Sequence, residues 1–439
     1  MNKLKIVIFL SVLAGALLAC SEIEEPMPAS PETSETSSMQ NSKYRSNEEL
    51  INIALEAYNA IKGHALGESA SRAGSTITIT PILPRLSRGS SDTLIQVVNY
   101  GNNQGFALVG AQKGSKDLLA LVEAGDYNPI ETSQVEGFQD FITRAESMLS
   151  SRPNIGDTTI CLIDTKTVME YVRTDFSGPN IETQWGQMDV FGAYCPNHIC
   201  GCVPLAVEMV MSYFEHPASM TFTFPERDLN YSTLNWSGMK SHFKRHSDTW
   251  PAEWNGIQLP DASNCPAIDM DHSNLGRVAR QIGYEMHSIY MEGETGTLTC
   301  GVPLEYLKQK FPGFTLERSG SFSQNLITGL ESGVIMAVSD DHGWVIDGHA
   351  FFMIYENTYR DYAPNVVGGD WRLIKSEIIG FNDLIHQNWG WNGQCNGYFL
   401  LDCYDPDDGI EYDPGSSRPT IAGYDSGAES SYEFCLISR

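Results

Sequence analysis

Basic residues are scarce in this chain of 439 residues, which has 28 lysines and arginines against 55 aspartates and glutamates. Its formal net charge is −27 at pH 7. Binding to a phosphate backbone requires clustered positive charge, and the sequence contains no basic cluster. The composition therefore argues against nucleic acid as a partner. An acidic surface favours solubility and does not by itself identify a substrate.

The start of the chain has no hydrophobic run of membrane-spanning length. Its apolar stretch, residues 6–19, is shorter than the roughly 20 residues that a transmembrane helix needs. Lys3 and Lys5 precede it, as in an export signal. The sequence Leu-Leu-Ala-Cys that ends at Cys20 resembles the lipobox of bacterial lipoproteins, so we expect Cys20 to carry a lipid anchor in a membrane. The alternative is a cleaved signal with an incidental cysteine. Both interpretations predict an exported protein, and we expect an outer-membrane or cell-surface lipoprotein that processing can release.

The sequence also lacks an internal repeat, so its organisation is inferred from composition and hydrophobic periodicity. Residues 21–45 are rich in Ser, Glu, Pro and Thr and have almost no large apolar side chains, which predicts a disordered tether. We divide the chain into a signal peptide, this tether, a small folded domain, a connector and a large domain, with the bounds 1–20, 21–45, 46–150, 151–180 and 181–439.

The small folded domain is predicted to combine helices with antiparallel strands. Residues 46–49 have the pattern of a capping box, and apolar residues follow at helical spacing up to Ile61. A second amphipathic helix is expected over 138–149, after strand-like runs at 93–99, 106–109 and 118–123. The connector that follows is polar and contains Pro153 and Gly156, so we expect proteolytic nicking there.

The large domain is predicted to begin with a helix that has a cysteine at its N-terminus. Pro204 fits the first turn of this helix, and one helical face is marked by Ala206, Met209, Val210 and Tyr213. Cys202 thus lies where unpaired N–H groups and the helix dipole favour a thiolate. Asp347-Gly348 is predicted to be a turn, with further helices over 275–282 and 304–311 and strands over 334–338, 344–346, 351–355, 384–388 and 397–401.

A cysteine nucleophile needs a histidine base and a group that fixes the imidazole. His342 leads a short apolar strand, so it can face a cleft from a rigid backbone. Further along the chain, Asn388 can accept a hydrogen bond from the imidazole N–H, and Trp389 can shield that bond from water. Gln187 supplies an amide donor for a developing oxyanion, beside the backbone N–H of Cys202.

Four sequence blocks together resemble the streptopain family of papain-like cysteine peptidases. They are Gln184-Trp-Gly-Gln187, Gly201-Cys202-Val203, His342-x-Trp-Val-Ile-Asp-Gly and Asn388-Trp-Gly-Trp391, and the match extends to Asn396-Gly-Tyr-Phe399. The resemblance implies an α+β fold in which a papain-like catalytic domain follows a small α+β propeptide domain that inhibits it. Residues 46–150 resemble that propeptide by pattern and position.

Carried over by position, the resemblance implies Cys202 as the nucleophile, His342 as the general base and acid, and Asn388 as the residue that orients the imidazole. Gln187 would complete the oxyanion hole, and Trp389 would cover the His–Asn pair. Cys202 and His342 are 140 residues apart, within the window of about 130–150 for papain-type enzymes. The implied protein is a secreted cysteine-type endopeptidase made as a zymogen, which hydrolyses peptide bonds of protein or peptide substrates through a thioacyl-enzyme. It needs no metal or organic cofactor.

Two alternatives concern the residues around the nucleophile and the base. His349, in Gly-His-Ala-Phe, imitates the family's histidine motif, although the longer match favours His342. A metal cluster built from Cys202 and its neighbours lacks a repeated Cys-x-x-Cys unit, so a disulfide from Cys195 or Cys200 is the preferred interpretation.

A third alternative changes the class of function. Asp341, Gly343 and Pro204 depart from the residues usual in the family at these positions. They would support a catalytically weak or inactive surface lipoprotein that uses the peptidase fold for binding.

Overall fold

The computed structural model describes residues 43–62, 77–82, 92–151, 165–243, 267–297, 302–320, 322, 324–339, 342–362, 370–404, 410–411, 420–421 and 433–439. The segment expected to be a signal peptide and nearly all of the expected tether lie outside these residues. The span from Lys43 to Arg439 forms one unit by its internal contacts. In the part that the structure describes, no helix is long and apolar enough to cross a membrane.

Helices and strands both contribute to the described chain, as expected for the α+β class. The helices are α1 (Asn47–Lys62), α3 (Pro129–Thr132), α4 (Glu136–Ser151), α5 (Cys202–Phe214), α6 (Trp236–His242), α8 (Ala267–Glu285), α9 (Val302–Lys310), α10 (Gln324–Gly329) and the 3-10 turn η2 (Leu401–Cys403). The strands are β1 (Thr78–Ile82), β2 (Ile95–Asn99), β3 (Phe106–Gly110), β4 (Leu118–Val122), β5 (Thr165–Ser177), β6 (Ser219–Thr221), β7 (Tyr231–Thr233), β8 (Ile289–Met291), β9 (Glu294–Gly296), β10 (Thr315–Ser319), β11 (Gly333–Val338), β12 (Gly343–Asp361), β13 (Trp371–Asn388), β14 (Gly397–Leu400), β15 (Ile410–Glu411), β16 (Thr420–Ile421) and β17 (Glu433–Ser438).

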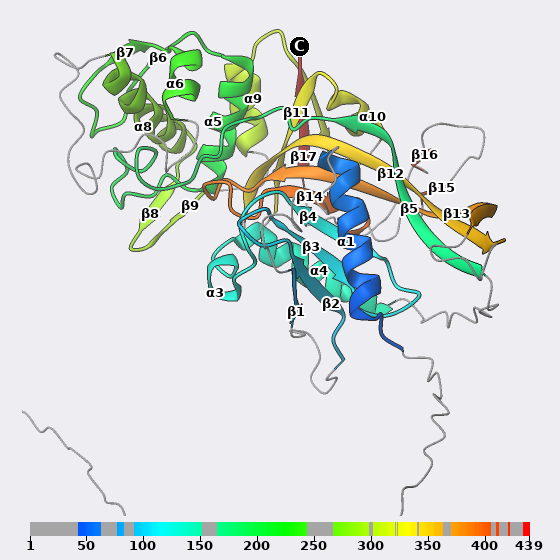
Figure 1. Ribbon diagram of the computed structural model, residues 1–439. Coiled ribbons are helices and arrows are strands. Elements are labelled where there is room, and N and C mark those ends of the chain that lie inside the picture. Colours follow the sequence, from blue (N-terminus) through cyan, green and yellow to red (C-terminus); the bar gives the residue numbers. More distant parts are fainter. Residues whose placement is uncertain are drawn as a thin grey trace, which may run out of the picture. The chain divides into compact units, whose positions relative to one another are not determined.

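One antiparallel sheet runs through most of the described chain (Figure 1). Its strand order is β1-β2-β3-β4-β14-β13-β12-β11-β17-β10, and β5 also pairs with β12. The strands expected at 93–99, 106–109, 118–123, 334–338 and 397–401 are confirmed as β2, β3, β4, β11 and β14.

The N-terminal part of the described chain, from α1 to α4, does not form a separate domain. The capping box predicted for α1 is present, since the Ser46 N–H donates to Glu49 and the Glu49 N–H donates to the Ser46 hydroxyl. Strand β4 pairs directly with β14, from Val122 opposite Gly397 to Ala120 opposite Phe399. A single apolar core therefore extends from α1, α4 and β2–β4 into β12, β13 and β14.

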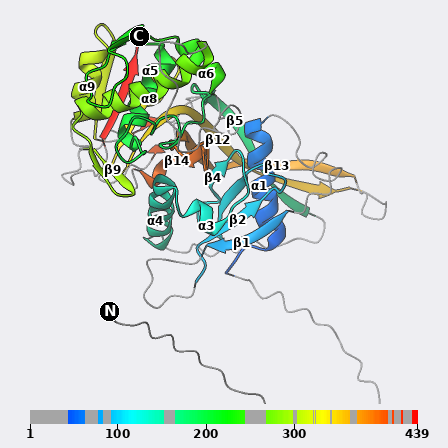
Figure 2. The same ribbon diagram turned by 90° about the vertical axis from the view of Figure 1, so that its left-hand side faces the viewer.

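The opposite end of the sheet carries a group of helices (Figures 1 and 2). There α5, α8 and α9 surround a second core, which β11 and Val345 of β12 complete. Every residue of α5 from Val203 to Ser212 is buried. Pro204 lies in its first turn, where the missing N–H costs no intrahelical hydrogen bond.

The prediction of a turn at Asp347-Gly348 is wrong, because β12 continues through it as a single strand with a bulge between Ile346 and Gly348. The Asp347 carboxylate is buried and paired, accepting from the Ile181 N–H at 2.7 Å and contacting His386 Nδ1 at 2.5 Å. These partners come from distant parts of the chain. The strands expected at 344–346 and 351–355 are therefore parts of one element.

The second half of the expected connector is also a strand. Residues 165–177 form β5, which pairs with β12 from Arg360 to His349, whereas residues 152–164 lie outside the described part. Between His342 and Asn388, the outer parts of β12 and β13 pair with each other, from Tyr355 opposite Ile378 to Asp361 opposite Trp371.

Glu208 lies inside α5, and neither of its carboxylate oxygens has a hydrogen-bond partner among the described residues. Burial raises the pKa of Glu208 well above its usual value of 4.5. The folded chain therefore keeps a proton that the unfolded chain releases near pH 4.5. Stability is lost as the pH rises from that value towards the raised pKa of the folded state.

We expect the Glu208→Gln chain to be more stable than the wild type above about pH 5, because glutamine cannot ionise. The gain should grow by up to about 1.4 kcal/mol per pH unit. Urea unfolding at a series of pH values measures it, with Glu305→Gln on the exposed face of α9 as the control. A gain that stays constant with pH would contradict this explanation.

Candidate active site

Cys202 is the first residue of α5, as the sequence predicts. The N-cap residue, Gly201, has φ 92° and makes no side-chain capping bond, so the first turn of the helix is not capped by a side chain. The Cys202 side chain is partly exposed, whereas Cys195, Cys200, Cys395, Cys403 and Cys435 are buried. Among the described cysteines, Cys202 is thus the one that meets solvent.

His342 interacts directly with Cys202. It lies immediately before β12, where Gly343 pairs with Val338 of β11. Burial opposes a thiolate, but the charge of His342 nearby and the Gly343 N–H together lower the pKa of the Cys202 thiol. Burial would also lower the pKa of His342, but Cys202 and Glu136 raise that pKa to about 10. The arrangement favours a thiolate–imidazolium pair.

The other ring nitrogen of His342 is held by the main chain. Nε2 lies 3.1 Å from the carbonyl oxygen of Trp389. A carbonyl only accepts hydrogen bonds, so Nε2 carries a proton and Nδ1 is the nitrogen that can exchange one. The indole of Trp344 stacks on the imidazole, with ring centroids 5.9 Å apart and planes at 14°. The tilted indole of Trp389 lies 6.4 Å from it.

The Asn388 side chain is anchored to other groups. Its Nδ2 donates to the Thr183 carbonyl at 2.9 Å, and its Oδ1 accepts from the Gly390 N–H at 3.3 Å. The imidazole contact that the sequence predicts for Asn388 is thus made by the carbonyl of the next residue, Trp389. Sequence reasoning places the correct segment beside His342, but the group that bonds the ring is a backbone atom.

The segment that contains Gln187 contacts both the loop before Cys202 and the segment around Trp391. Gly186 forms a β-bridge with Trp391, and the Asn392 N–H donates to the Trp185 carbonyl at 2.9 Å. The carbonyl of Gln187 accepts from the Cys200 N–H at 2.9 Å, two residues before Cys202. The Gln187 side chain is partly buried, and its role as an oxyanion donor stays a prediction.

Helix α4, in the segment that resembles a propeptide, contacts this site through two residues that sequence reasoning missed. Glu136 at its start lies 3.5 Å from Nδ1 of His342, an ion-pair contact rather than a hydrogen bond. A Cβ added to Gly137 would come within 2.2 Å of Trp389 Cε3 and 3.1 Å of His342 Cδ2. Only glycine allows the helix to approach so closely. No local signal in the sequence marks these two residues.

The structure also describes His349 and the cysteines near Cys202, for which the sequence suggests alternative roles. His349 lies within β12, where its Nε2 contacts the Asp383 carboxylate at 2.5 Å, and it has no described contact with Cys202. The disulfide expected from Cys195 or Cys200 is wrong for the described residues, because both carry free thiols. No group of three potential metal ligands is arranged to hold an ion in the part that the structure describes.

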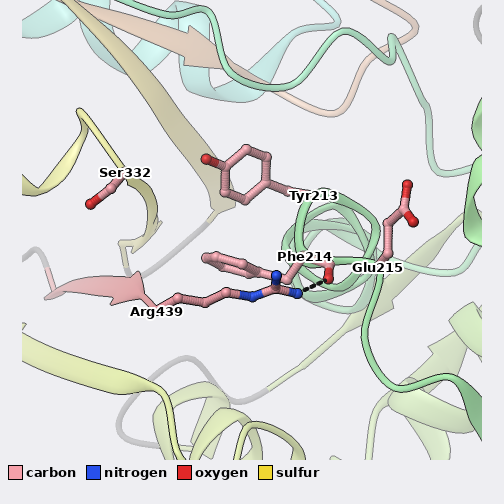
Figure 3. Close-up of a pocket in the computed structure, with 5 residues that line it drawn as sticks. All are labelled: Tyr213, Phe214, Glu215, Ser332 and Arg439. Atoms are coloured by element: carbon pink, nitrogen blue, oxygen red, sulfur yellow. Dashed lines mark hydrogen bonds between the residues drawn. The ribbon is translucent and has the colours of Figure 1, made fainter.

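A separate pocket of about 350 Å³ lies at the other end of α5 and is lined by Tyr213, Phe214, Glu215, Ser332 and Arg439 (Figure 3). There the Arg439 guanidinium donates to the Phe214 carbonyl at 2.7 Å. A helix rises about 1.5 Å per residue, so the length of α5 separates this pocket from Cys202 by about 18 Å. The pocket is therefore not part of the candidate active site.

Comparison with known proteins gives one family match. Residues 185–399, just under half of the chain, match the model of the Peptidase C10 family. This confirms the family resemblance of that segment and supports a peptidase, of the cysteine type. Ten chains of solved structures also match, among them a fragment of prointerpain A from Prevotella intermedia with a cysteine-to-alanine substitution. That match has 15% identity and a TM-score of 0.48, and it covers 82% of this chain and 98% of the fragment. No curated protein matches the chain.

Proposed function

We propose, from the Peptidase C10 match of residues 185–399, that this chain is a secreted cysteine endopeptidase made as a zymogen. The observation that carries the proposal is the pairing of Cys202 with His342, which lowers the pKa of the thiol. A buried structural cysteine has the opposite property, as Cys195 illustrates, because burial raises the pKa of its thiol to about 12.

In the proposed reaction, the Cys202 thiolate attacks the scissile carbonyl of a peptide and forms a tetrahedral intermediate. The Cys202 N–H at the start of α5 and the Gln187 amide stabilise the oxyanion. His342 gives a proton from Nδ1 to the leaving amine, which leaves a thioacyl-enzyme that water hydrolyses. Trp389 holds His342 through its carbonyl, and Asn388 supports the backbone at that point.

In the proposed zymogen, the N-terminal part blocks the cleft through α4. A second contact supports this docking, because Glu123, the residue after β4, lies 3.4 Å from Nε2 of His386 in β13. Lys62 of α1 lies 2.6 Å from the same carboxylate, within the N-terminal part. Burial opposes the charge of Glu123, but His386 and Lys62 lower its pKa to about 2. This contribution is present above the usual pKa of 4.5 and is lost as the pH falls towards 2.

The test is a peptide-hydrolysis assay combined with a thiol-directed irreversible inhibitor. We expect the processed protein to cleave internal peptide bonds and the inhibitor to label Cys202 ahead of the other cysteines, with loss of activity in proportion to labelling. Hydrolysis without selective labelling of Cys202 would contradict the assigned nucleophile. No hydrolysis and no selective labelling would favour the inactive binding lipoprotein.

Replacing Glu136 by glutamine should change the site only while α4 covers it. The Glu136 carboxylate raises the pKa of both His342 and Cys202, so its removal should move the pH midpoint of Cys202 alkylation to a lower value in the uncleaved chain. The effect is small, because Glu136 is 60% exposed and solvent screens it. Iodoacetamide labelling against pH measures the midpoint. An unchanged midpoint in the uncleaved Glu136→Gln chain would show that this carboxylate does not act on the Cys202–His342 pair.

Export and lipid anchoring at Cys20 are part of the proposal and rest on the sequence alone. We expect the wild-type protein to partition into detergent and to incorporate labelled fatty acid when made in a Gram-negative host. The Cys20→Ala variant should do neither. Incorporation of fatty acid by that variant would place the anchor elsewhere.

A further inference from the structure

The hairpin of β8 and β9 stands apart from the main sheet and contacts the nucleophile loop, residues 195–201, which leads to Cys202. Asn197 of this loop makes the first link. Its Nδ2 donates to the carbonyls of Met291 at 2.9 Å and Glu294 at 2.8 Å, one in each strand of the hairpin. The loop and the hairpin are thereby joined across almost a hundred residues of sequence.

Thr295 makes the second link, and its hydroxyl bonds in two directions. Oγ1 donates to the Ile199 carbonyl at 2.8 Å and lies 2.8 Å from Asn197 Nδ2, whose two hydrogens are shared among this oxygen and the two carbonyls. The Oδ1 of Asn197 in turn accepts from the Ile199 N–H at 3.1 Å. Both backbone polar groups of Ile199, three residues before Cys202, are therefore held by side chains.

The nucleophile loop needs this support because its backbone contains unfavourable conformations. His198 has φ 63°, in the left-handed region that residues other than glycine rarely adopt. Gly201 has φ 92°, and a Cβ placed there would lie 3.1 Å from Cγ2 of Thr295. The methyl group of Thr295 thus packs on the residue before Cys202 while its hydroxyl holds Ile199.

We propose that Thr295 is a positioning residue, which together with Asn197 forms a clamp that keeps the Cys202 sulfur in register with His342. This inference rests on the proposed cysteine-peptidase function. The clamp acts through the main chain of residues 197–201, since Ile199 and Gly201 are the groups that Thr295 holds. A misplacement of about 1 Å can cost about 100-fold in rate, so the hydroxyl should matter more for kcat than for KM.

The test compares Thr295→Val, which keeps the shape and removes the hydroxyl, with Thr295→Ser, which keeps the hydroxyl. In the full chain, iodoacetamide alkylation of Cys202, followed by mass spectrometry, should be about tenfold slower for Thr295→Val, with its pH midpoint raised. In the processed enzyme, kcat should fall by about 10- to 100-fold while KM stays within about twofold. Thr295→Ser should restore both quantities to near the wild-type values.

Thr297, the residue after β9, provides a matched control. Thr297 makes a 2.7 Å hydroxyl contact with Ser288 and has no described contact with the nucleophile loop, so Thr297→Val should alter neither readout. The proposed clamp is contradicted if Cys202 in Thr295→Val is alkylated at the wild-type rate. It is also contradicted if Thr295→Ser loses as much alkylation rate and kcat as Thr295→Val. Slowed alkylation that serine rescues, in a chain that hydrolyses no peptide, would retain the clamp and overturn the peptidase function.

Discussion

A full-length chain that carries Cys202→Ala is expected to remain uncleaved in isolation and to hydrolyse peptides at least about 10⁴-fold more slowly than the wild type. Removal of the nucleophile from a triad-type site leaves only the contribution of substrate binding and oxyanion stabilisation. In this protein no other described thiol can replace it. The described cysteines other than Cys202 are buried, and burial raises the pKa of the Cys200 and Cys395 thiols.

The measurement follows processing of both purified chains over time, together with hydrolysis of a peptide library. Active wild-type enzyme added in a small amount should cleave the Cys202→Ala chain, which shows that this chain remains a competent substrate. Cys435→Ala serves as the control for loss of a buried thiol. If the wild-type and Cys202→Ala chains are processed equally in isolation, the zymogen does not cleave itself. Equal hydrolysis of peptides would remove Cys202 from the mechanism.

The second large effect is expected from Gly137→Val, which should expose the site without any cleavage of the chain. The added side chain has no room, because its Cβ would lie 2.2 Å from Cε3 and 2.4 Å from Cζ3 of the Trp389 indole. That indole is 1% exposed and donates through Nε1 to the Cys395 carbonyl, so it cannot move aside easily. Overpacking of this kind costs about 1–3 kcal/mol, which corresponds to about a 5- to 150-fold shift towards the undocked form.

Labelling of Cys202 in the uncleaved chain measures the shift, and Gly137→Ala should give a smaller effect than valine. Ser147→Val is the matched control, since it adds a β-branched residue to an exposed position of the same helix. Thermal unfolding of each variant separates undocking from unfolding of the shared core. Labelling of Gly137→Val at the wild-type rate would show that α4 does not block the site.

The elements that sequence alone could predict are those with a local signal. The capping box at residues 46–49 marks the start of α1, and the periodicity after Cys202 marks α5. The motif at residues 342–348 favours His342 over His349, and in the structure His342 interacts with Cys202 whereas His349 pairs with Asp383. The catalytic role of His342 stays a prediction. In each case neighbouring residues in the chain contain the information.

The features that the sequence could not reveal depend on distant partners. Asp347-Gly348 has the composition of a turn, yet its carboxylate is satisfied by Ile181 and His386, so the strand continues. The imidazole of His342 bonds to a carbonyl rather than to Asn388, and any residue at position 389 would supply that group. The approach of Gly137 to Trp389 joins positions about 250 residues apart without a pattern at either one.

The pairing of β4 with β14 has a consequence for the proposed processing of the chain. In the precursor, β14 is an interior strand with neighbours on both sides. Excision of the N-terminal part would turn it into an edge strand, because Gly397, Tyr398 and Phe399 would lose the strand that they face in β4. An unpaired edge of this kind is a template for pairing with another strand, so the proposed processing would uncover a site for self-association as well as the active site.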